Sequence, residues 1–366
     1  MKNCDFIAAQ LIEWYSDNRR DLPWRNTSDP YKIWISEIIL QQTRVAQGLE
    51  YYNRFVERFP DVQALASADE QEVLKLWQGL GYYSRARNLH LAAKTIFSEY
   101  NAVFPKDYQA VLNLKGIGEY TAAAIVSFAW NMPYPVVDGN VFRFLSRLFA
   151  INEPIDTNKG KKQFTELAGK LMDKTQAGLF NQAIMEFGAL QCTPASPDCP
   201  VCPFQSRCPA YATNSVEQFP VKQNKTQTKD LYLYYFHIHD GRQVWINQRH
   251  HKGIWQNLFE FPLIEAETSL SFEQLSEIIR QKSWLPGTTG YSFRLIIENK
   301  KHILSHRILH ASFYEVHMEK LPAITEFISI DIRNWEEYPL HRLMQYYLET
   351  TANGKSYSIL KIPFAG

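Results

Sequence analysis

The sequence has few cysteines, no excess charge of either sign and no long apolar run. Its 366 residues include 39 Lys and Arg against 38 Asp and Glu, which gives a formal net charge of +1. Any polyanionic partner must therefore be bound by a local basic patch. No apolar stretch approaches the roughly 18 residues of a membrane span, and Asp5 lies where a signal peptide would need its apolar core. We therefore expect a cytoplasmic protein without a membrane partner.

The composition also excludes a disordered chain and a disulfide framework. Hydrophobic residues make up 45% of the sequence and aromatic residues 14%, which is enough for two or three domains with real cores. Four of the five cysteines lie between positions 192 and 208, and such clustering is typical of a metal site.

The periodicity of apolar residues changes along the chain. Spacings of three and four predict an all-α domain over residues 1–212. Residues 213–229 are rich in Asn, Ser, Gln and Thr, which is typical of a linker. Strand patterns follow at 231–239, 243–248 and 307–318, and short helical patterns at 272–281 and 340–349. We therefore predict an α+β domain over residues 230–366.

The clustered cysteines are Cys192, Cys199, Cys202 and Cys208, and prolines separate them. Four thiolates from one irregular loop can saturate a tetrahedral zinc ion or a four-iron cluster, and spacing alone does not decide between them. Reduced buried cysteines are the alternative, but a Pro-rich loop offers no core for them to fill. We therefore predict a structural metal site at 192–208.

Gly116 and Gly118 lie between two predicted helices in the region of about 110–130. Two glycines at a helix start allow a tight turn and leave backbone N–H groups bare, which suits a phosphate. An ordinary interhelical turn with a glycine cap is the structural alternative.

Two acidic residues are predicted to lie in unlike environments. Glu37 is the single charge in the apolar helix 33–40, so burial should raise its pKa toward the range of a general acid. Asp138 opens an amphipathic helix. The alternatives are a buried ion pair for Glu37 and a helix N-cap for Asp138. One protonated and one ionised carboxyl would suit cleavage of a glycosidic bond through an oxocarbenium-like state.

These motifs together resemble the adenine DNA glycosylases of the MutY family, which belong to the helix-hairpin-helix DNA glycosylase superfamily. The resemblance covers about residues 8–212. Its motifs are Leu22-Pro23-Trp24-Arg25, Ser36-Glu37 with Leu40-Gln41-Gln42-Thr43, Gly79 to Arg85, Gly116 to Thr121, Val137 to Val141 and the four cysteines. It implies a 4Fe-4S cluster on the cysteines, with structural zinc as the alternative. It also implies removal of adenine mispaired with 8-oxoguanine, or with guanine, from double-stranded DNA.

The resemblance assigns roles by position. Glu37 would protonate adenine at N7, Asp138 would stabilise the sugar cation, and Tyr120 and Asn140 would fix these groups. Relatives that cleave the strand carry a lysine in place of Tyr120, so the tyrosine predicts a monofunctional enzyme. The implied DNA- and lesion-binding residues are Gln41, Gln42, Thr43, Leu80, Tyr82, Gly116 and Gly118. By analogy, Trp24, Arg25 and Gln182 line the base pocket. Lys115, Arg85, Arg87 and Arg143 could contact phosphates, and a solvated surface position is the alternative for each.

Several of these residues have plain structural alternatives. Gln41, Gln42 and Thr43 could form a polar helix end, and Tyr82 could belong to an aromatic cluster.

The second domain resembles the Nudix-like domain that this family uses to bind 8-oxoguanine. Residues 253–262 are similar to the corresponding turn, and Leu304-Ser305-His306 resembles the family's Phe-Ser-His loop with Leu replacing the aromatic residue. Ser305 and His306 would hydrogen-bond the oxidised base. No R-E-x-x-E-E helix follows, so we expect binding without hydrolysis and no catalytic metal.

Three rival functions stay open at this point. They are an endonuclease III-like glycosylase-lyase, a non-catalytic lesion-binding protein and a sanitiser of oxidised nucleotides. For the main hypothesis we expect a monomer of bacterial type, associated with the nucleoid when on DNA, whose binding weakens as salt rises.

Overall fold

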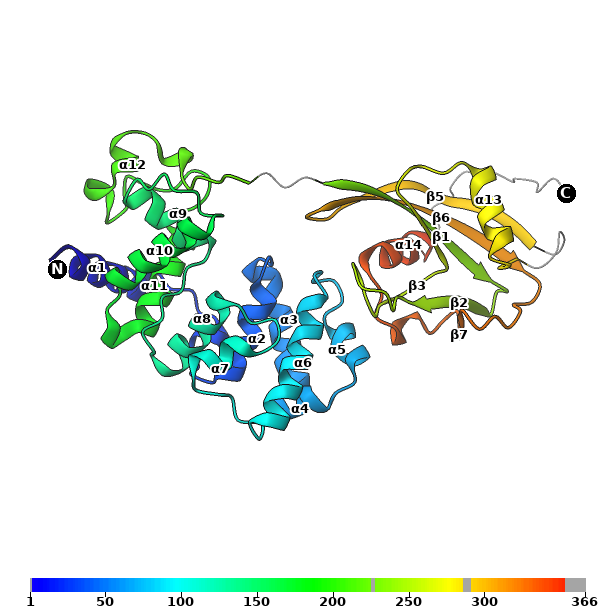
Figure 1. The fold of residues 1–366 in the computed structure, drawn as a ribbon, viewed down its shortest axis with the longest axis horizontal. Coiled ribbons are helices and arrows are strands. Elements are labelled where there is room, and N and C mark those ends of the chain that lie inside the picture. The colour runs from blue at the N-terminus through cyan, green and yellow to red at the C-terminus, as the bar shows by residue number, and fades with distance from the viewer. Residues whose placement is uncertain (1, 225–227, 286–290, 353–366) are drawn as a thin grey trace. The chain divides into compact units, whose positions relative to one another are not determined.

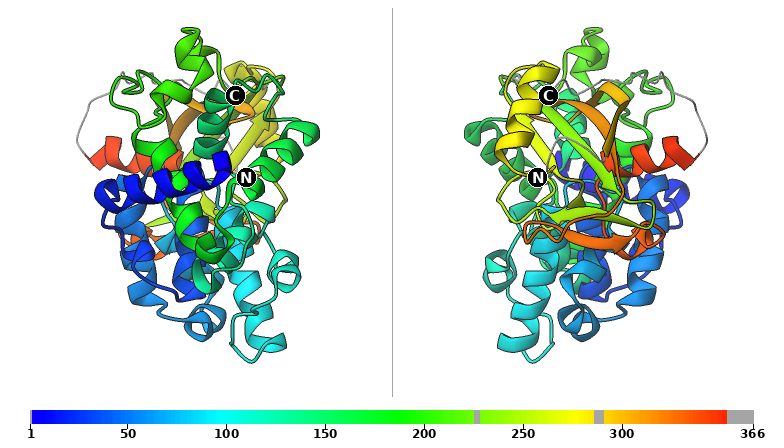
Figure 2. Two further views of the ribbon diagram at one scale, coloured as in Figure 1. Left: turned by 90° about the vertical axis from the view of Figure 1, so that its left-hand side faces the viewer. Right: turned by 90° about the vertical axis from the view of Figure 1, so that its right-hand side faces the viewer.

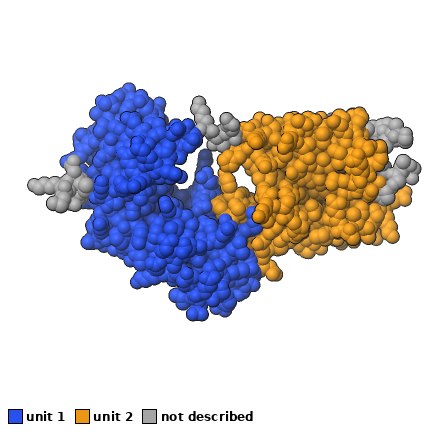
Figure 3. All heavy atoms as spheres, viewed as in Figure 1, with its two compact units in different colours: residues 1–68, 87–225 blue, residues 69–86, 226–366 orange. Residues whose placement is uncertain are grey.

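The computed structural model describes residues 2–224, 228–285 and 291–352. The chain divides into two compact units (Figure 3). We call residues 1–68 with 87–225 the helical unit, and residues 69–86 with 226–366 the sheet unit. The domain limits given by the sequence stay a prediction, and the grouping of residues 69–86 with the C-terminal residues is a feature that the sequence does not reveal.

The helical unit contains helices joined by short loops (Figure 1). Their bounds are α1 (Lys2–Asn18), α2 (Pro30–Leu40), α3 (Val45–Arg58), α4 (Val62–Ser67), α6 (Ser84–Glu99), α7 (Tyr108–Asn113), α8 (Glu119–Trp130), α9 (Gly139–Leu148), α10 (Asn158–Leu171), α11 (Ala177–Leu190) and α12 (Pro209–Ala212). Local signals set several ends: Asp29 caps α2 ahead of Pro30, and Asn131, in the left-handed conformation at φ 56°, ends α8. Among the described residues, none of the helices has the length and apolar character needed to cross a membrane.

One core joins α1, α8, α9, α10 and α11. Its members are fully or nearly fully buried, and they include Leu11, Ala124, Leu145, Phe164, Ile184 and Phe187. The central α11 contacts α1, α8 and α9, and α8 also contacts α2. This packing brings the starts of α8 and α9 toward α2. The two acidic residues singled out in the sequence are Glu37, which lies on α2, and Asp138, which lies at the start of α9.

The sheet unit is built on a twisted mixed sheet. Its elements are α5 (Glu70–Leu76), β1 (Lys229–His239), β2 (Gln243–Gln248), β3 (Phe259–Glu260), β4 (Leu263–Ala266), α13 (Phe272–Gln281), β5 (Tyr291–Ile303), β6 (Arg307–Met318), β7 (Ile328–Asp331) and α14 (Arg342–Ala352). The strand order is β3-β2-β1-β6-β5, with β4 paired to β1 and β7 to β2. The long pair β1 and β6 is parallel, and β5 and β6 are antiparallel.

Side chains along β1 and β6 point alternately to the two faces of the sheet, and a different helix packs on each face (Figures 1 and 2). Phe236 and Tyr314 pack with Leu275 of α13. Phe313, whose side chain points the other way, stacks on Tyr347 of α14 at 4.9 Å between ring centroids. The all-α and α+β assignments made from the sequence are confirmed.

The segment 69–86 is attached to the rest of the sheet unit by hydrogen bonds. Asn257 Nδ2 donates to Glu70 Oε1 at 2.5 Å, and Lys75 Nζ donates to the Tyr338 carbonyl at 3.1 Å. The Leu340 amide donates to Gln78 Oε1 at 3.1 Å. Helix α5 of this segment ends at Leu76, since a turn with Gly79 at φ 100° follows.

Gly188 provides a test of the packing at the start of α9. A Cβ at Gly188 would lie 2.6 Å from the Asn140 carbonyl oxygen and 2.8 Å from its Cβ, so α11 passes α9 too closely for a side chain. We expect Gly188→Ala to lower the free energy of unfolding by about 1–3 kcal/mol, measured by urea denaturation.

Gly169→Ala is the matched control. This glycine lies within α10, and its added Cβ would meet its nearest neighbour, Pro135 Cγ, at the ordinary contact distance of 3.8 Å. This change should stabilise the protein by about 0.5–1 kcal/mol through helix propensity. Equal effects of the two substitutions would contradict the close approach of α11 to α9.

Candidate active site and cysteine loop

Glu37 lies on a helix with almost no solvent-facing side. Ile33, Trp34, Ile35, Ile38 and Ile39 of α2 are buried, and Glu37 itself is 5% exposed. The hydroxyl of Tyr120, in the first turn of α8, donates to Glu37 Oε2 at 2.7 Å. The buried carboxyl is therefore held by a phenol, while the charge of Arg25 also acts on it.

Asp138 caps α9 and is fixed by three hydrogen bonds. Its Oδ1 accepts from the backbone N–H groups of Asn140 at 2.9 Å and Val141 at 2.8 Å, and its Oδ2 accepts from Asn140 Nδ2 at 2.7 Å. The N-cap role considered from the sequence is therefore present. It also holds the carboxylate in one orientation.

The two carboxyl groups are electrostatically coupled. Burial raises the pKa of Glu37, and the nearby charge of Asp138 raises it further, while Arg25 and the Tyr120 hydrogen bond lower it. Burial also raises the pKa of Asp138, but here the hydrogen bonds from Val141 and Asn140 oppose the shift. Three bonds to ionised oxygens favour the carboxylate, so Asp138 is the better site for the negative charge and Glu37 for the proton.

Two buried arginines of α9 link Asn140 to the cysteine loop. Arg143, which is 8% exposed, donates to Asn140 Oδ1 at 2.8 Å and to the Cys192 carbonyl at 2.7 Å. Arg147 donates to the Thr193 carbonyl at 2.7 Å and to Cys192 Sγ at 3.4 Å. Sequence reasoning missed Arg147 and placed Arg143 at a phosphate, which is wrong. Their only signal was a four-residue spacing on a helix that leads toward the cysteines.

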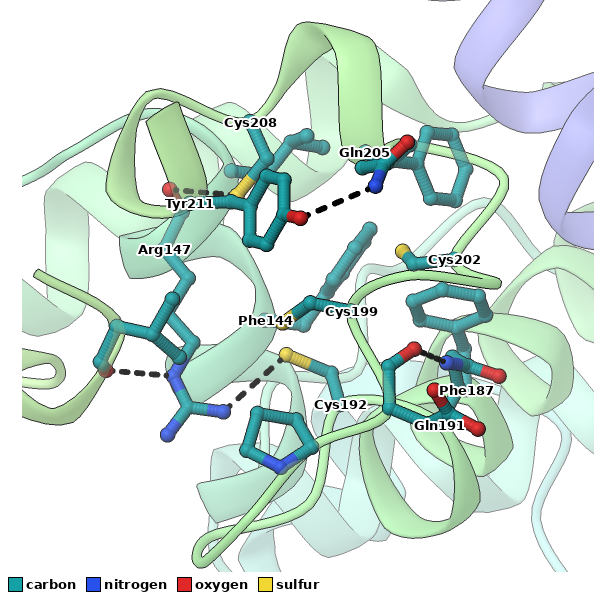
Figure 4. A pocket seen from close by; sticks show the side chains of 15 residues that line it. Phe144, Arg147, Phe187, Gln191, Cys192, Cys199, Cys202, Gln205, Cys208 and Tyr211 are labelled. Atoms are coloured by element: carbon teal, nitrogen blue, oxygen red, sulfur yellow. Dashed lines mark hydrogen bonds between the residues drawn. The ribbon is translucent and has the colours of Figure 1, made fainter. Parts of the chain in front are cut away.

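The four cysteines line one pocket (Figure 4). Phe144, Phe187 and Phe204 form its apolar wall, and Arg147 lies beside Cys192 and Cys208. Within this described loop, no three of the sulfur atoms lie within 4.8 Å of one another. Tetrahedral zinc with bonds of about 2.3 Å would hold its sulfurs about 3.8 Å apart, so the pocket fits a larger centre better.

The turn between α7 and α8 has the predicted glycines in distinct roles. Gly116 adopts φ 80°, and a Cβ there would lie 2.6 Å from Asn88 Cβ. Gly118 is the N-cap of α8 and has open space around it, with no side chain capping the helix. The exposed N-terminus of α8 is therefore accessible to an anion. The helix begins at Glu119, and the next residue, Tyr120, contacts Glu37.

The three residues expected at the base pocket have different surroundings. Arg25 lies over the ring of Phe128 at 5.1 Å and acts electrostatically on Glu37. Gln182 Oε1 accepts from Tyr15 at 2.8 Å. Trp24 is buried against Tyr52, with ring centroids 5.0 Å apart.

The residues expected at the lesion fall into two groups. In the helical unit, Gln41 donates to Thr121 Oγ1 at 3.3 Å, while Gln42 is exposed at φ 59° and Thr43 follows it. In the sheet unit, Tyr82 is 51% exposed, and its hydroxyl lies 2.5 Å from Ser305 Oγ. His306 is exposed beside Ser305 in the β5–β6 turn.

Two further residues of the segment 69–86 are buried. Leu80 is buried, and Arg85 is buried and donates to the Leu80 and Gly81 carbonyls. The phosphate contact expected for Arg85 is therefore wrong, since this side chain holds the loop that presents Tyr82.

A buried ionic network occupies the centre of the sheet unit. Arg249 pairs with Glu260 at 2.7 Å and with Glu265 at 2.6 Å, and His341 lies 3.2 Å from Glu260. Burial raises the pKa of Glu260 to about 7 against the pull of Arg249. Arg249 therefore holds both carboxylates of this network.

Comparison with known families gives the two parts of the chain different matches. Residues 35–170 match the HhH-GPD superfamily of base excision DNA repair proteins, and residues 234–350 match the NUDIX domain. The first part of the fold is similar to a thermostable thymine-DNA glycosylase, with a TM-score of 0.54 and 29% identity over 58% of this chain and 98% of that one. These matches define a DNA glycosylase of the helix-hairpin-helix superfamily, a hydrolase of base excision repair.

Curated relatives narrow the class. The adenine DNA glycosylase of Buchnera aphidicola subsp. Baizongia pistaciae is 36% identical over 82% of this chain and 83% of its own length. The enzyme of Buchnera aphidicola subsp. Acyrthosiphon pisum is 32% identical over 94% and 97%. The chain therefore belongs to the adenine DNA glycosylase family, as its motifs suggested.

The raised pKa of Glu37 makes stability depend on pH. The folded protein holds this proton more tightly than the unfolded chain, whose carboxyl titrates near 4.5. Above that pH the carboxyl is ionised in the unfolded chain but still protonated in the folded protein, so the folded state binds more protons. The free energy of unfolding of the wild type therefore falls as pH rises toward the folded pKa. Relative to the wild type, Glu37→Gln should gain about 1.4 kcal/mol of stability for each pH unit between 4.5 and the folded pKa.

The measurement is urea denaturation of both proteins at a series of pH values. Glu119→Gln, an exposed change one residue before Tyr120, should show no such trend. A stability difference for Glu37→Gln that is independent of pH would refute the raised pKa.

Proposed function

We propose that this enzyme removes adenine mispaired with 8-oxoguanine, or with guanine, from double-stranded DNA and leaves an abasic site. The observation that carries the proposal is the buried Glu37 carboxyl hydrogen-bonded to Tyr120 at 2.7 Å. The names of the relatives support adenine as the base, and the Nudix-like unit supports recognition of an oxidised partner base. Because the proposed substrate is double-stranded DNA, the protein would act in the compartment that contains the chromosome.

The site residues account for each change in bonding. The adenine must leave the base stack to reach Glu37, which lies below the surface. Glu37 donates its proton to N7 of adenine, and the electron pair of the glycosidic bond then moves onto the departing base. The sugar becomes an oxocarbenium ion, which the carboxylate of Asp138 stabilises. Addition of water and return of a proton to Glu37 complete the hydrolysis.

The contacts of Tyr120 favour a monofunctional reaction. A lyase forms a Schiff base between a lysine amine and the sugar, and a phenol cannot do so. In the described residues, the charged groups that shift the pKa of Glu37 are Arg25 and Asp138, and neither is an amine nucleophile.

The cysteine loop is suited to a 4Fe-4S cluster held by Cys192, Cys199, Cys202 and Cys208. The apolar wall and the fact that no three sulfur atoms of this described loop lie within 4.8 Å of one another support this assignment over zinc. When bound, such a cluster would cross-link the loop whose carbonyl groups accept hydrogen bonds from Arg143 and Arg147. Its role is therefore structural, and the chemistry at adenine needs only the side chains of the helical unit.

The sheet unit would read the base opposite adenine. Tyr82, Ser305 and His306 offer an exposed ring, a hydroxyl and an imidazole within one unit. An aromatic ring can enter the base stack, and the two polar groups can hydrogen-bond an oxidised purine. Binding to phosphates through a focused basic surface, by a monomer, would weaken as salt rises.

The reaction is tested with end-labelled duplexes that carry adenine opposite 8-oxoguanine, adenine opposite thymine, or thymine glycol. We expect strand breaks at adenine opposite 8-oxoguanine that appear only after hot alkali. Glu37→Gln should lower the rate of adenine release by at least about 100-fold, because general acid catalysis contributes a rate factor of that size.

Glu119→Gln is the control, since it removes one exposed carboxylate from the same helix start. Breaks without alkali would identify a lyase, and retained binding without breaks would identify a lesion-binding protein. Full activity of Glu37→Gln would remove Glu37 from the mechanism.

Recognition of the opposite base is tested with Ser305→Ala. We expect kcat/KM for adenine opposite 8-oxoguanine to fall about 10-fold relative to adenine opposite guanine, which is the effect of one lost hydrogen bond. Ser329→Ala, an exposed serine on β7, should leave this ratio unchanged. An equal loss on both duplexes would show that Ser305 does not distinguish the bases.

A further inference from the structure

A group of metal-ligating side chains lies on the sheet unit, and none of its members belongs to the site described above. The parallel strands β1 and β6 align His237 with Glu315 and His239 with His317. Alternate residues of a strand share a face, so all four side chains lie on the same side of the sheet. One ligand atom from each of His237, His239 and Glu315 lies within 4.8 Å of the other two.

His237 presents a buried nitrogen with no hydrogen-bond partner. The residue is 8% exposed, and its Nδ1 lies 2.8 Å from the hydroxyl of Tyr347. Its Nε2 is buried and makes no hydrogen bond. Leaving a buried polar atom unpaired costs stability, so this nitrogen is an open ligand position rather than a satisfied core group.

The other two ligands face the same space. His239 Nε2 is also buried, and its one polar neighbour in the group is Glu315 Oε1 at 3.5 Å, a long ion-pair contact that lowers the pKa of Glu315 and that a bound ion would replace. Arg294 binds the second oxygen of Glu315 and so fixes the carboxylate. The His237 and His239 rings stack with centroids 4.5 Å apart.

The surroundings resemble those of a protein metal site. Tyr347 orients the His237 ring through Nδ1, as an outer partner does for a ligating histidine, and Phe261 and Trp335 shield that ring. The His239 and Glu315 side chains are 12% and 24% exposed, so an ion can enter from that side.

We propose that His237, His239 and Glu315 form a three-ligand site for Zn²⁺ or a similar first-row transition-metal ion, with a fourth position open to water. Two imidazoles and one carboxylate suit such ions, whereas magnesium and calcium prefer oxygen ligands alone. Bonds of about 2.0–2.1 Å in tetrahedral geometry place ligand atoms about 3.3 Å apart, close to the His239–Glu315 separation of 3.5 Å. The site does not depend on the proposed base excision.

Metal binding has a local consequence at the β1–β2 turn. The Gly241 amide now donates to His239 Nδ1 at 3.2 Å. Coordination through Nε2 leaves the proton of the neutral ring on Nδ1, which then can no longer accept from Gly241. The Gly241 amide must therefore change its environment when the ion binds.

The test is a Zn²⁺ titration of the full-length protein by calorimetry after treatment with a chelator. We expect the wild type to bind one more zinc ion per chain than His239→Asn or Glu315→Gln. All of these proteins keep the four cysteines, so binding at the cysteine loop cancels in the comparison. Tyr347→Phe should keep the stoichiometry and weaken the affinity about 10-fold, as loss of an outer partner does.

His310→Asn is the matched control, because His310 also lies on β6 and pairs with an acid, Asp230, at 2.7 Å. It should bind as the wild type does. A readout on the unaltered protein is the Gly241 amide resonance in a glycine-labelled sample, which should shift on addition of zinc. Equal stoichiometry in all variants together with an unmoved Gly241 resonance would overturn the proposal.

Discussion

The hydrogen bond from Tyr120 to Glu37 is the interaction on which the arrangement of the active site depends. A carboxyl on a helix without a solvent face needs a partner, and α8 supplies it from its first turn. The same turn begins at Gly118, where the helix N-terminus is bare. Gly118 is two residues before Tyr120, so the bare helix end and the tyrosine that holds the buried carboxyl belong to one short segment.

Helix α9 plays the corresponding part for the second carboxyl. Its N-terminus is capped by Asp138, and its later turns carry Arg143 and Arg147 into the cysteine loop. Asn140 connects the two, because its side chain donates to Asp138 and accepts from Arg143. Order in the loop and orientation of Asp138 are therefore physically linked across three side chains.

The sequence was sufficient for the two fold classes and for the residues with a strong local signature. The charge of Glu37 stands alone in an apolar helix, and Asp138 stands at a helix start, so pattern alone reveals both. The environment of Arg143 depends on which carbonyls the cysteine loop presents, and the grouping of Tyr82 with Ser305 depends on contacts 223 positions apart in the chain. No periodicity encodes such contacts.

The association of residues 69–86 with the C-terminal strands changes how the architecture should be regarded. In the sequence, the Nudix-like part follows the helical part as if it were a separate domain. In the folded chain, Glu70, Lys75 and Gln78 form their hydrogen bonds with residues beyond position 256. A fragment that begins at the linker would therefore lack these three hydrogen-bonding side chains, so the sheet unit is complete only in a chain that also contains residues 69–86.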